Sequence, residues 1–108
     1  MKVHIAAKGL ELTDELEKYA HHKLARLNRK VPRRLRAEAG YELSLTQTTS
    51  KGAKYNTCSI VLTLGEHECM AKETTLHMHA ALDVAVVQIE QQLKVLPRRR
   101  RRISWPRP

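Results

Sequence analysis

Two segments of the chain carry apolar residues three and four positions apart, which is the spacing of a helix with one buried face. The first begins after Thr13, whose hydroxyl can accept a hydrogen bond from a free helix amide. Asp14, Glu15 and Glu17 follow, and their negative charges suit the positive end of a helix dipole. Pro32 ends this helix or follows shortly after its end. The apolar positions are Leu16, Tyr19, Ala20, Leu24, Leu27 and Val31.

The second helical segment is longer and contains neither Gly nor Pro before Pro97. Either Thr74 or Thr75 is predicted to cap its N-terminus, because a threonine hydroxyl satisfies amides that lack a partner inside the helix. Its apolar positions are Met78, Leu82, Ala85, Val86, Ile89, Leu93 and Leu96.

Shorter segments alternate between apolar and polar residues, which is typical of strands with one buried face. The first strand is predicted from Lys2 to Ala6, with Val3 and Ile5 on one side. A second strand is predicted from Ala37 to Leu45, where every odd position is apolar. The following residues, 47–54, are rich in turn formers and are predicted to form a loop.

Two further strands are predicted on either side of a tight turn at Gly65 and Glu66. Cys58, Ile60, Leu62 and Leu64 share one side of the third strand, and Cys69 and Ala71 share one side of the fourth, His67 to Glu73. With short connections, the last three strands should form an antiparallel meander.

The predicted order is therefore β-α-β-β-β-α, and each helix has a single apolar stripe. We expect an α+β two-layer sandwich over residues 1–96, in which both helices pack on one face of a four-stranded sheet. Residues 97–108 have no apolar period and carry like charge, so we predict a disordered, arginine-rich basic tail there.

The charge of the chain points to a polyanionic partner. The net charge is +9 and the pI is about 10.0, and such a field attracts nucleic acid or, less well here, an anionic membrane. The segment from Lys18 to Arg36 holds eight Lys or Arg and no acid, and the segment from Arg98 to Arg107 holds six Arg and no acid. Trp105 could stack on a base or insert at a lipid surface.

Other classes of function find little support in the sequence. Two cysteines cannot form a disulfide framework, and the N-terminus lacks a signal peptide, so a reducing cytoplasm is expected. No apolar run approaches the roughly 18 residues that cross a bilayer. His67 and Cys69 supply at most half of a zinc site, so no bound metal or other cofactor is predicted. Asp83 has no nucleophile beside it, so no enzyme activity on a small-molecule substrate is predicted.

Two stretches, KVHIAAKGLELTDELEKYAHHKLARL and MHAALDVAVVQIEQQLKVL, resemble the ribosome hibernation promoting factor family. Members share a Thr-capped first helix ending in Lys-x-x-Lys/Arg-Leu, and a second helix opening near Met-Tyr-Ala-Ala-Ile-Asp. These motifs correspond here to Lys23-Leu24-Ala25-Arg26-Leu27 and to Met78-His79-Ala80-Ala81-Leu82-Asp83. The likeness spans about residues 1–96. Long forms of the family carry an additional dimerisation domain that this chain is too short to contain, so the resemblance is to a short form, such as a ribosome-associated inhibitor or a sigma-54 modulation-like protein.

The resemblance implies a monomer that binds the small ribosomal subunit in the channel for mRNA and tRNA and inhibits translation by steric blockade. Family members contact ribosomal RNA phosphates through both helices, which carries over to Lys23, Arg26 and Lys94. One departure is Gln88-Ile89-Glu90-Gln91-Gln92-Leu93, where the family has Lys-Leu-x-Arg-Gln-Leu and two more positive charges. The arginine cluster after Pro97 could compensate for them.

Taken together, charge and resemblance predict an RNA-binding surface with no catalytic or metal-binding residue. Its candidates are Lys18, His22, Lys23, Arg26, Arg29, Lys30, Arg33, Arg34, Arg36, His79, Lys94, Arg98, Arg99, Arg100, Arg101 and Arg102. Two alternatives stay open at this point: a general structured-RNA binder or RNA chaperone, and a protein-interaction adaptor that uses the helix-free sheet face with Glu38 and Glu42.

Overall fold

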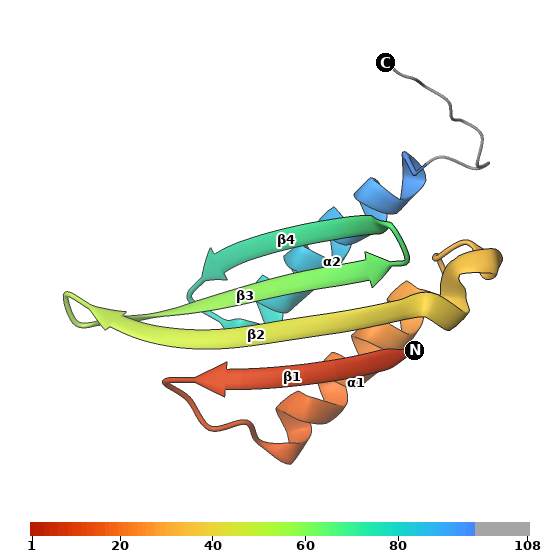
Figure 1. Cartoon of the computed structure of the whole chain (residues 1–108). Coiled ribbons are helices and arrows are strands. Elements are labelled where there is room, and N and C mark those ends of the chain that lie inside the picture. The colour runs from red at the N-terminus through yellow and green to blue at the C-terminus, as the bar shows by residue number, and fades with distance from the viewer. Residues whose placement is uncertain (97–108) are drawn as a thin grey trace.

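The computed structural model describes residues 1–96, and its main elements follow the predicted order (Figure 1). The elements are β1 (Lys2–Lys8), α1 (Asp14–Asn28), the 3-10 helix η1 (Arg33–Glu38), β2 (Ala39–Ser50), β3 (Ala53–Leu64), β4 (His67–Thr75) and α2 (Met78–Lys94). The predicted disordered tail, with Arg98, Arg99, Arg100, Arg101, Arg102 and Trp105, lies outside the described residues.

The four strands form one mixed sheet in the order β1-β2-β3-β4. β2, β3 and β4 pair antiparallel, so the predicted meander is confirmed. β1 pairs parallel with β2, from Lys2 opposite Gly40 to Lys8 opposite Thr46. A parallel pair needs a crossover connection, and α1 supplies it.

Both helices cover the same face of the sheet, which confirms the two-layer α+β sandwich (Figure 1). Strand alternation explains the choice of face, because successive side chains point to opposite sides. On β3, Cys58, Ile60, Leu62 and Leu64 are fully buried beneath the helices, as predicted. The helices contribute Leu16, Ala20, Leu24 and Leu27 from α1, and Met78, Ala81, Leu82, Ala85, Val86, Ile89 and Leu93 from α2.

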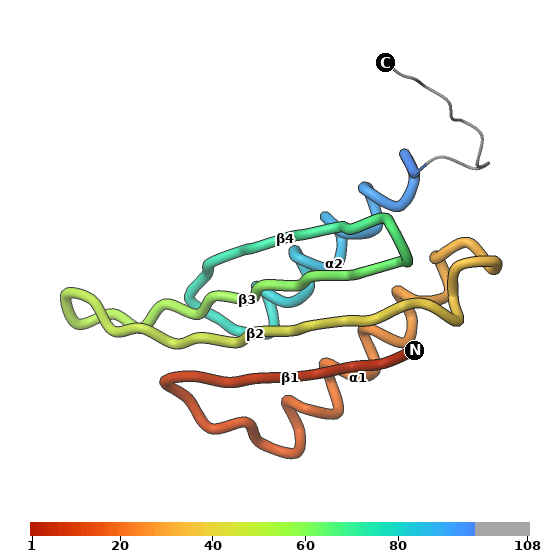
Figure 2. Tube along the Cα trace, in the orientation of Figure 1, coloured from red at the N-terminus to blue at the C-terminus, as the bar shows by residue number. Residues whose placement is uncertain are grey.

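The second strand differs from its prediction at both ends. Residues 33–38 form η1, so the strand begins at Ala39 rather than Ala37. The predicted loop over residues 47–54 is wrong, because β2 and β3 stay paired until Ser50 and Ala53 (Figure 2). Only Lys51 and Gly52 turn, with φ of 51° and 81°, which is the backbone that a two-residue hairpin requires.

The cap of the first helix is confirmed and that of the second is wrong. The Thr13 hydroxyl accepts a hydrogen bond from the Leu16 amide at 3.1 Å. Thr74 and Thr75 instead belong to β4, and the N-cap of α2 is His77, whose side chain makes no capping bond. The Thr75 hydroxyl accepts from the His77 amide at 3.0 Å, and thereby orders the connection before the helix.

Contacts at the base of the β2–β3 hairpin hold both helix starts in place. Gln47 donates to the side-chain oxygen of Asn56 at 2.8 Å, and Asn56 donates to the Leu76 carbonyl at 3.0 Å, just before α2. Gly9, between β1 and α1, has φ of +80° and packs directly on the Gln47 carbonyl. The two helices are therefore positioned against the same strand residues.

Alanine substitutions at Gly9 and Gly52 compare the cost of a positive φ alone with the cost of a positive φ and a steric overlap together. Gly9→Ala should destabilise the protein by about 3 kcal/mol, since the new methyl adds an overlap with the Gln47 backbone to the cost of a positive φ. Gly52→Ala is the control, because its φ is +81° but nothing lies within 4 Å of the new methyl, so about 1 kcal/mol is expected. Urea unfolding measures both, and equal losses would contradict the packing role of Gly9.

Candidate nucleic-acid interface

The two helices lie side by side and run in the same direction (Figure 1). Hydrogen bonds and ion pairs between side chains join them in matching order along their length. Near the start of α2, the Tyr19 hydroxyl donates to Asp83 at 2.5 Å, and the Lys23 ammonium lies 3.3 Å from the same carboxylate. Further along, the Lys30 ammonium lies 3.4 Å from the Glu90 carboxylate.

A groove runs between the helices and continues past their C-terminal ends. It consists of two adjoining hollows of about 410 Å³ and 380 Å³. The first is lined by Lys23, Arg26, Leu27, Arg29, Lys30, Val86 and Glu90, and the second by Lys30, Pro32, Arg34, Glu90, Leu93, Lys94 and Leu96. We call these residues together the interhelical groove.

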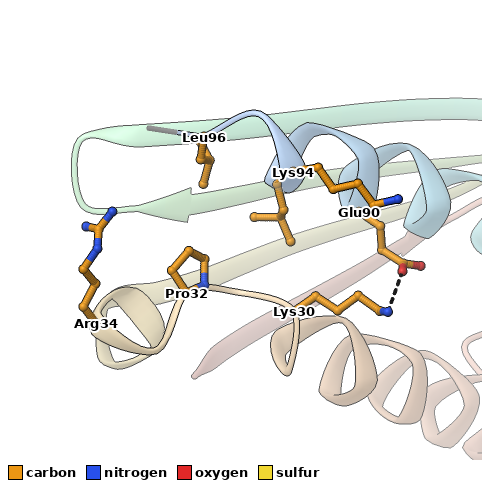
Figure 3. A pocket seen from close by; sticks show the side chains of 7 residues that line it. Lys30, Pro32, Arg34, Glu90, Lys94 and Leu96 are labelled. Atoms are coloured by element: carbon orange, nitrogen blue, oxygen red, sulfur yellow. Dashed lines mark ion pairs between the residues drawn. The ribbon is translucent and has the colours of Figure 1, made fainter. Parts of the chain in front are cut away.

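Positive charge dominates this groove. Six of its lining residues are cations, namely Lys23, Arg26, Arg29, Lys30, Arg34 and Lys94, and Glu90 is the one acid among them. Both helices also end here, and helix C-termini stabilise nearby cations. Figure 3 shows Lys30 reaching from the end of α1 toward Glu90, with Lys94 on the same side of α2. The arrangement can hold phosphates along a line between the helices.

A polar cluster lies at the other end of the helix pair. The Tyr19 ring packs on the His79 ring with centroids 4.5 Å apart, and Lys23 lies 6.0 Å from the Tyr19 centroid. Partial burial acts to raise the pKa of Asp83, but the hydrogen bonds from Tyr19 and Lys23 and the charges of Lys23 and His79 lower it overall. The carboxylate therefore stays ionised and holds Lys23 against α2.

The structure brings some of the predicted RNA-binding residues together and separates others. Lys18, His22 and Arg33 are exposed outside the groove. His79 lies in the cluster with Tyr19. The Arg36 guanidinium donates to the carbonyls of Val31 at 3.0 Å and Arg29 at 2.6 Å, so it satisfies backbone groups at the end of α1. The predicted RNA-binding residues that line the groove are Lys23, Arg26, Arg29, Lys30, Arg34 and Lys94.

Gln88 and Gln91, which replace the two positive charges of the family motif, do not line this groove. Gln88 donates to Glu73 of β4 at 3.1 Å, and Gln91 is exposed. Gln92, which matches the glutamine of the motif, accepts from the Met70 amide at 3.0 Å and donates to the Met70 carbonyl at 2.6 Å, so it pairs with the edge of the sheet. This flank of α2 therefore serves the contact with β4.

Sequence reasoning missed three residues of the helix pair. It assigned Tyr19 only to the apolar stripe, and it connected neither Asp83 nor Glu90 with the basic residues of α1. A signal was present, because residues 79, 83, 86 and 90 are three or four apart and so share one flank of α2. That this flank faces α1 was not readable from either helix alone.

Residues 1–96 show no activated cysteine, metal site or membrane-spanning helix. Burial raises the pKa of the Cys58 thiol to about 12, and Cys69 is also buried, so neither cysteine is an activated nucleophile. Within this range, no group of three or more His, Cys, Asp or Glu side chains could hold a metal ion. None of the helices in this part of the chain is long and apolar enough to cross a membrane.

Comparison with known proteins gives one family and one fold. A family model described as sigma 54 modulation protein / S30EA ribosomal protein matches residues 3–101. The N-terminal domain of Protein Y from Thermus thermophilus has a TM-score of 0.66 and 24% identity, over 87% of this chain and 97% of that one. A ribosomal subunit interface protein from Coxiella burnetii has a TM-score of 0.70 and 17% identity, over 87% and 94%. No curated protein sequence matches significantly.

Removal of the Asp83 charge should alter the dependence of stability on pH. Because the fold lowers the pKa of Asp83, its contribution is complete above about pH 5 and declines as pH falls through the folded-state value. Asp83→Asn should cost less than about 1 kcal/mol at pH 7, since the pair is partly exposed. The difference in stability between the Asp83→Asn variant and the original protein should become smaller toward pH 3.

Thermal unfolding followed by circular dichroism from pH 3 to pH 7 measures this change. Glu66→Gln, in the exposed turn between β3 and β4, is the matched control for loss of one carboxylate. A deficit of the same size at every pH would show that Asp83 does not act through its charge.

Proposed function

The chain belongs to the sigma 54 modulation protein / S30EA ribosomal protein family, and from this membership we propose that it is a ribosome hibernation factor. In this proposal it binds the small ribosomal subunit in the channel that mRNA and tRNA occupy, and it inhibits translation by steric blockade. It acts in the cytoplasm, where ribosomes are, and it acts by binding rather than by catalysis.

The observation that carries the proposal is the interhelical groove, because it gathers six cations around one acid on the surface opposite the sheet. Ribosomal RNA is a dense array of phosphates with condensed counterions. Each cation that replaces a counterion gains free energy from its release, and the affinity falls with salt by a log–log slope of about −0.7 to −0.9 per contact. Such a groove fits a phosphate backbone better than it fits a neutral ligand.

Specificity in this proposal comes from the shape of the folded RNA. Contacts to phosphates carry little information about base sequence, and structured RNA is read mainly by shape and backbone. The helix pair is held in place by its buried core residues, and the Tyr19–Asp83 and Lys23–Asp83 contacts join the two helices at the surface. A rigid cationic groove selects for a particular phosphate spacing, which is a property of a folded ribosomal RNA rather than of single strands.

Sucrose-gradient sedimentation with separated bacterial ribosomal subunits and whole ribosomes tests the proposal. We expect stoichiometric comigration with small subunits and whole ribosomes at low salt, less at moderate salt, and none with large subunits alone. Equal comigration with both subunits would indicate a general RNA binder. Absence from every ribosomal fraction would exclude the function.

Charge reversal on α1 and η1 should abolish this binding. The variant with Glu in place of Lys23, Arg26, Arg29 and Arg33 should bind small subunits at least about 100-fold more weakly, since repulsion replaces several phosphate contacts. The control variant reverses Lys2, Lys8, Lys51 and Lys72, which are exposed on the sheet and its hairpin turn. Circular dichroism verifies that both variants fold, and equal losses of affinity would show that the basic residues between Lys23 and Arg33 have no special role.

We further propose that residues 1–96 are the ribosome-binding domain and that the arginine-rich segment after Pro97 adds affinity. Deletion of residues 98–108 should then weaken small-subunit binding and flatten its salt dependence, while the melting transition stays cooperative. Fluorescence anisotropy of labelled protein at several salt concentrations measures both quantities. Loss of cooperative melting would instead assign this segment a structural role.

A further inference from the structure

Glu90 occupies an unusual place in the interhelical groove. It is the one acid that lines either hollow, and together with Lys30 it lines both. The ion pair between them joins α2 to the end of α1 (Figure 3). It therefore crosses the groove at the boundary between the two hollows, with Lys23, Arg26 and Arg29 on one side and Arg34 and Lys94 on the other.

The two partners of this ion pair differ in their exposure to solvent. The Glu90 side chain is 26% exposed, whereas the Lys30 side chain is 59% exposed. Glu90 is thus the more confined partner of the pair, and Lys30 is the partner with more room to move. Exposed ion pairs contribute little to stability, about 0–1 kcal/mol, so a phosphate that approaches the groove can compete with Glu90 for Lys30.

We propose that Glu90 restrains RNA affinity by drawing Lys30 across the groove and keeping it from phosphate. The inference rests on the proposed function, because it concerns the same groove. A phosphate backbone that runs along both hollows has to pass the Lys30–Glu90 ion pair, and it gains the Lys30 contact only when that pair opens. Removal of the Glu90 charge should free Lys30 and tighten binding.

The opposite role for Glu90 predicts the opposite sign. If the ion pair positioned Lys30 for phosphate, loss of the carboxylate would leave the lysine disordered and would weaken binding. The sign of the effect therefore decides between the two roles. Glu90→Gln suits the test because glutamine keeps the size of the side chain but removes the negative charge that attracts Lys30.

Fluorescence anisotropy with small ribosomal subunits at about 0.1 M salt measures the change. Glu90→Gln should tighten binding about three- to tenfold, which is the gain expected from one added lysine–phosphate contact at this salt concentration. The log–log salt slope should steepen by about 0.7 to 0.9, the value of one added phosphate contact. In a Lys30→Met background, Glu90→Gln should change affinity by less than about twofold, since no lysine remains to be freed.

The matched control is Glu68→Gln, which also removes one negative charge but lies on the helix-free face of β4. It should leave affinity and slope almost unchanged, because its side chain lies on the face of the sheet opposite the helices and does not line the groove. Equal gains for both substitutions would overturn the proposal, as would unchanged or weaker binding of the Glu90→Gln variant. A full gain that persists without Lys30 would also overturn it.

Elution from a heparin column gives a second readout that needs no ribosome. The Glu90→Gln variant should elute at higher salt than both the original protein and the Glu68→Gln variant, because the freed lysine adds a contact to this polyanion. Coelution of the two variants would contradict the inference even if the original protein bound no ribosomal subunit. Failure to bind subunits would instead count against the proposed function alone.

Discussion

Burial of one face of the sheet beneath two parallel helices is the constraint on which the rest of the molecule depends. The strands offer only one apolar face, and each helix offers only one apolar stripe, so both helices must share that face. Their remaining flanks then meet each other. The interhelical groove is therefore a consequence of core packing, and its rigidity comes from fully buried residues such as Leu24, Leu82 and Ile89.

The concentration of positive charge in the groove requires compensation within the fold. Like charges repel, and the helix pair reduces this cost with acids on the facing flank of α2. Asp83 holds Lys23, and Glu90 holds Lys30. Arg36 directs its guanidinium to backbone carbonyls at the end of α1 instead of into the groove. The surface that remains is cationic, as the proposed binding of phosphates requires.

The edge strand β4 is covered by a second flank of α2. The flank of α2 that faces away from α1 carries Gln92, whose amide pairs with both backbone groups of Met70. An unpaired edge invites association with another strand, and a side chain that occupies its hydrogen-bonding groups opposes this. One helix thus presents a stripe to the core, a flank to the groove and a flank to the sheet edge.

The sequence by itself determined the element order, the buried stripes and the excess of positive charge on α1, because periodicity and charge are properties of consecutive residues. It predicted a loop over residues 47–54 where only Lys51 and Gly52 turn, since strand pairing to Ser50 and Ala53 depends on the backbone angles of those two residues. Only the tertiary structure decided which basic residues share a groove and that Glu90 faces Lys30. These relations join residues about 60 positions apart, and only the packing of both helices on one sheet face brings such distant residues into contact.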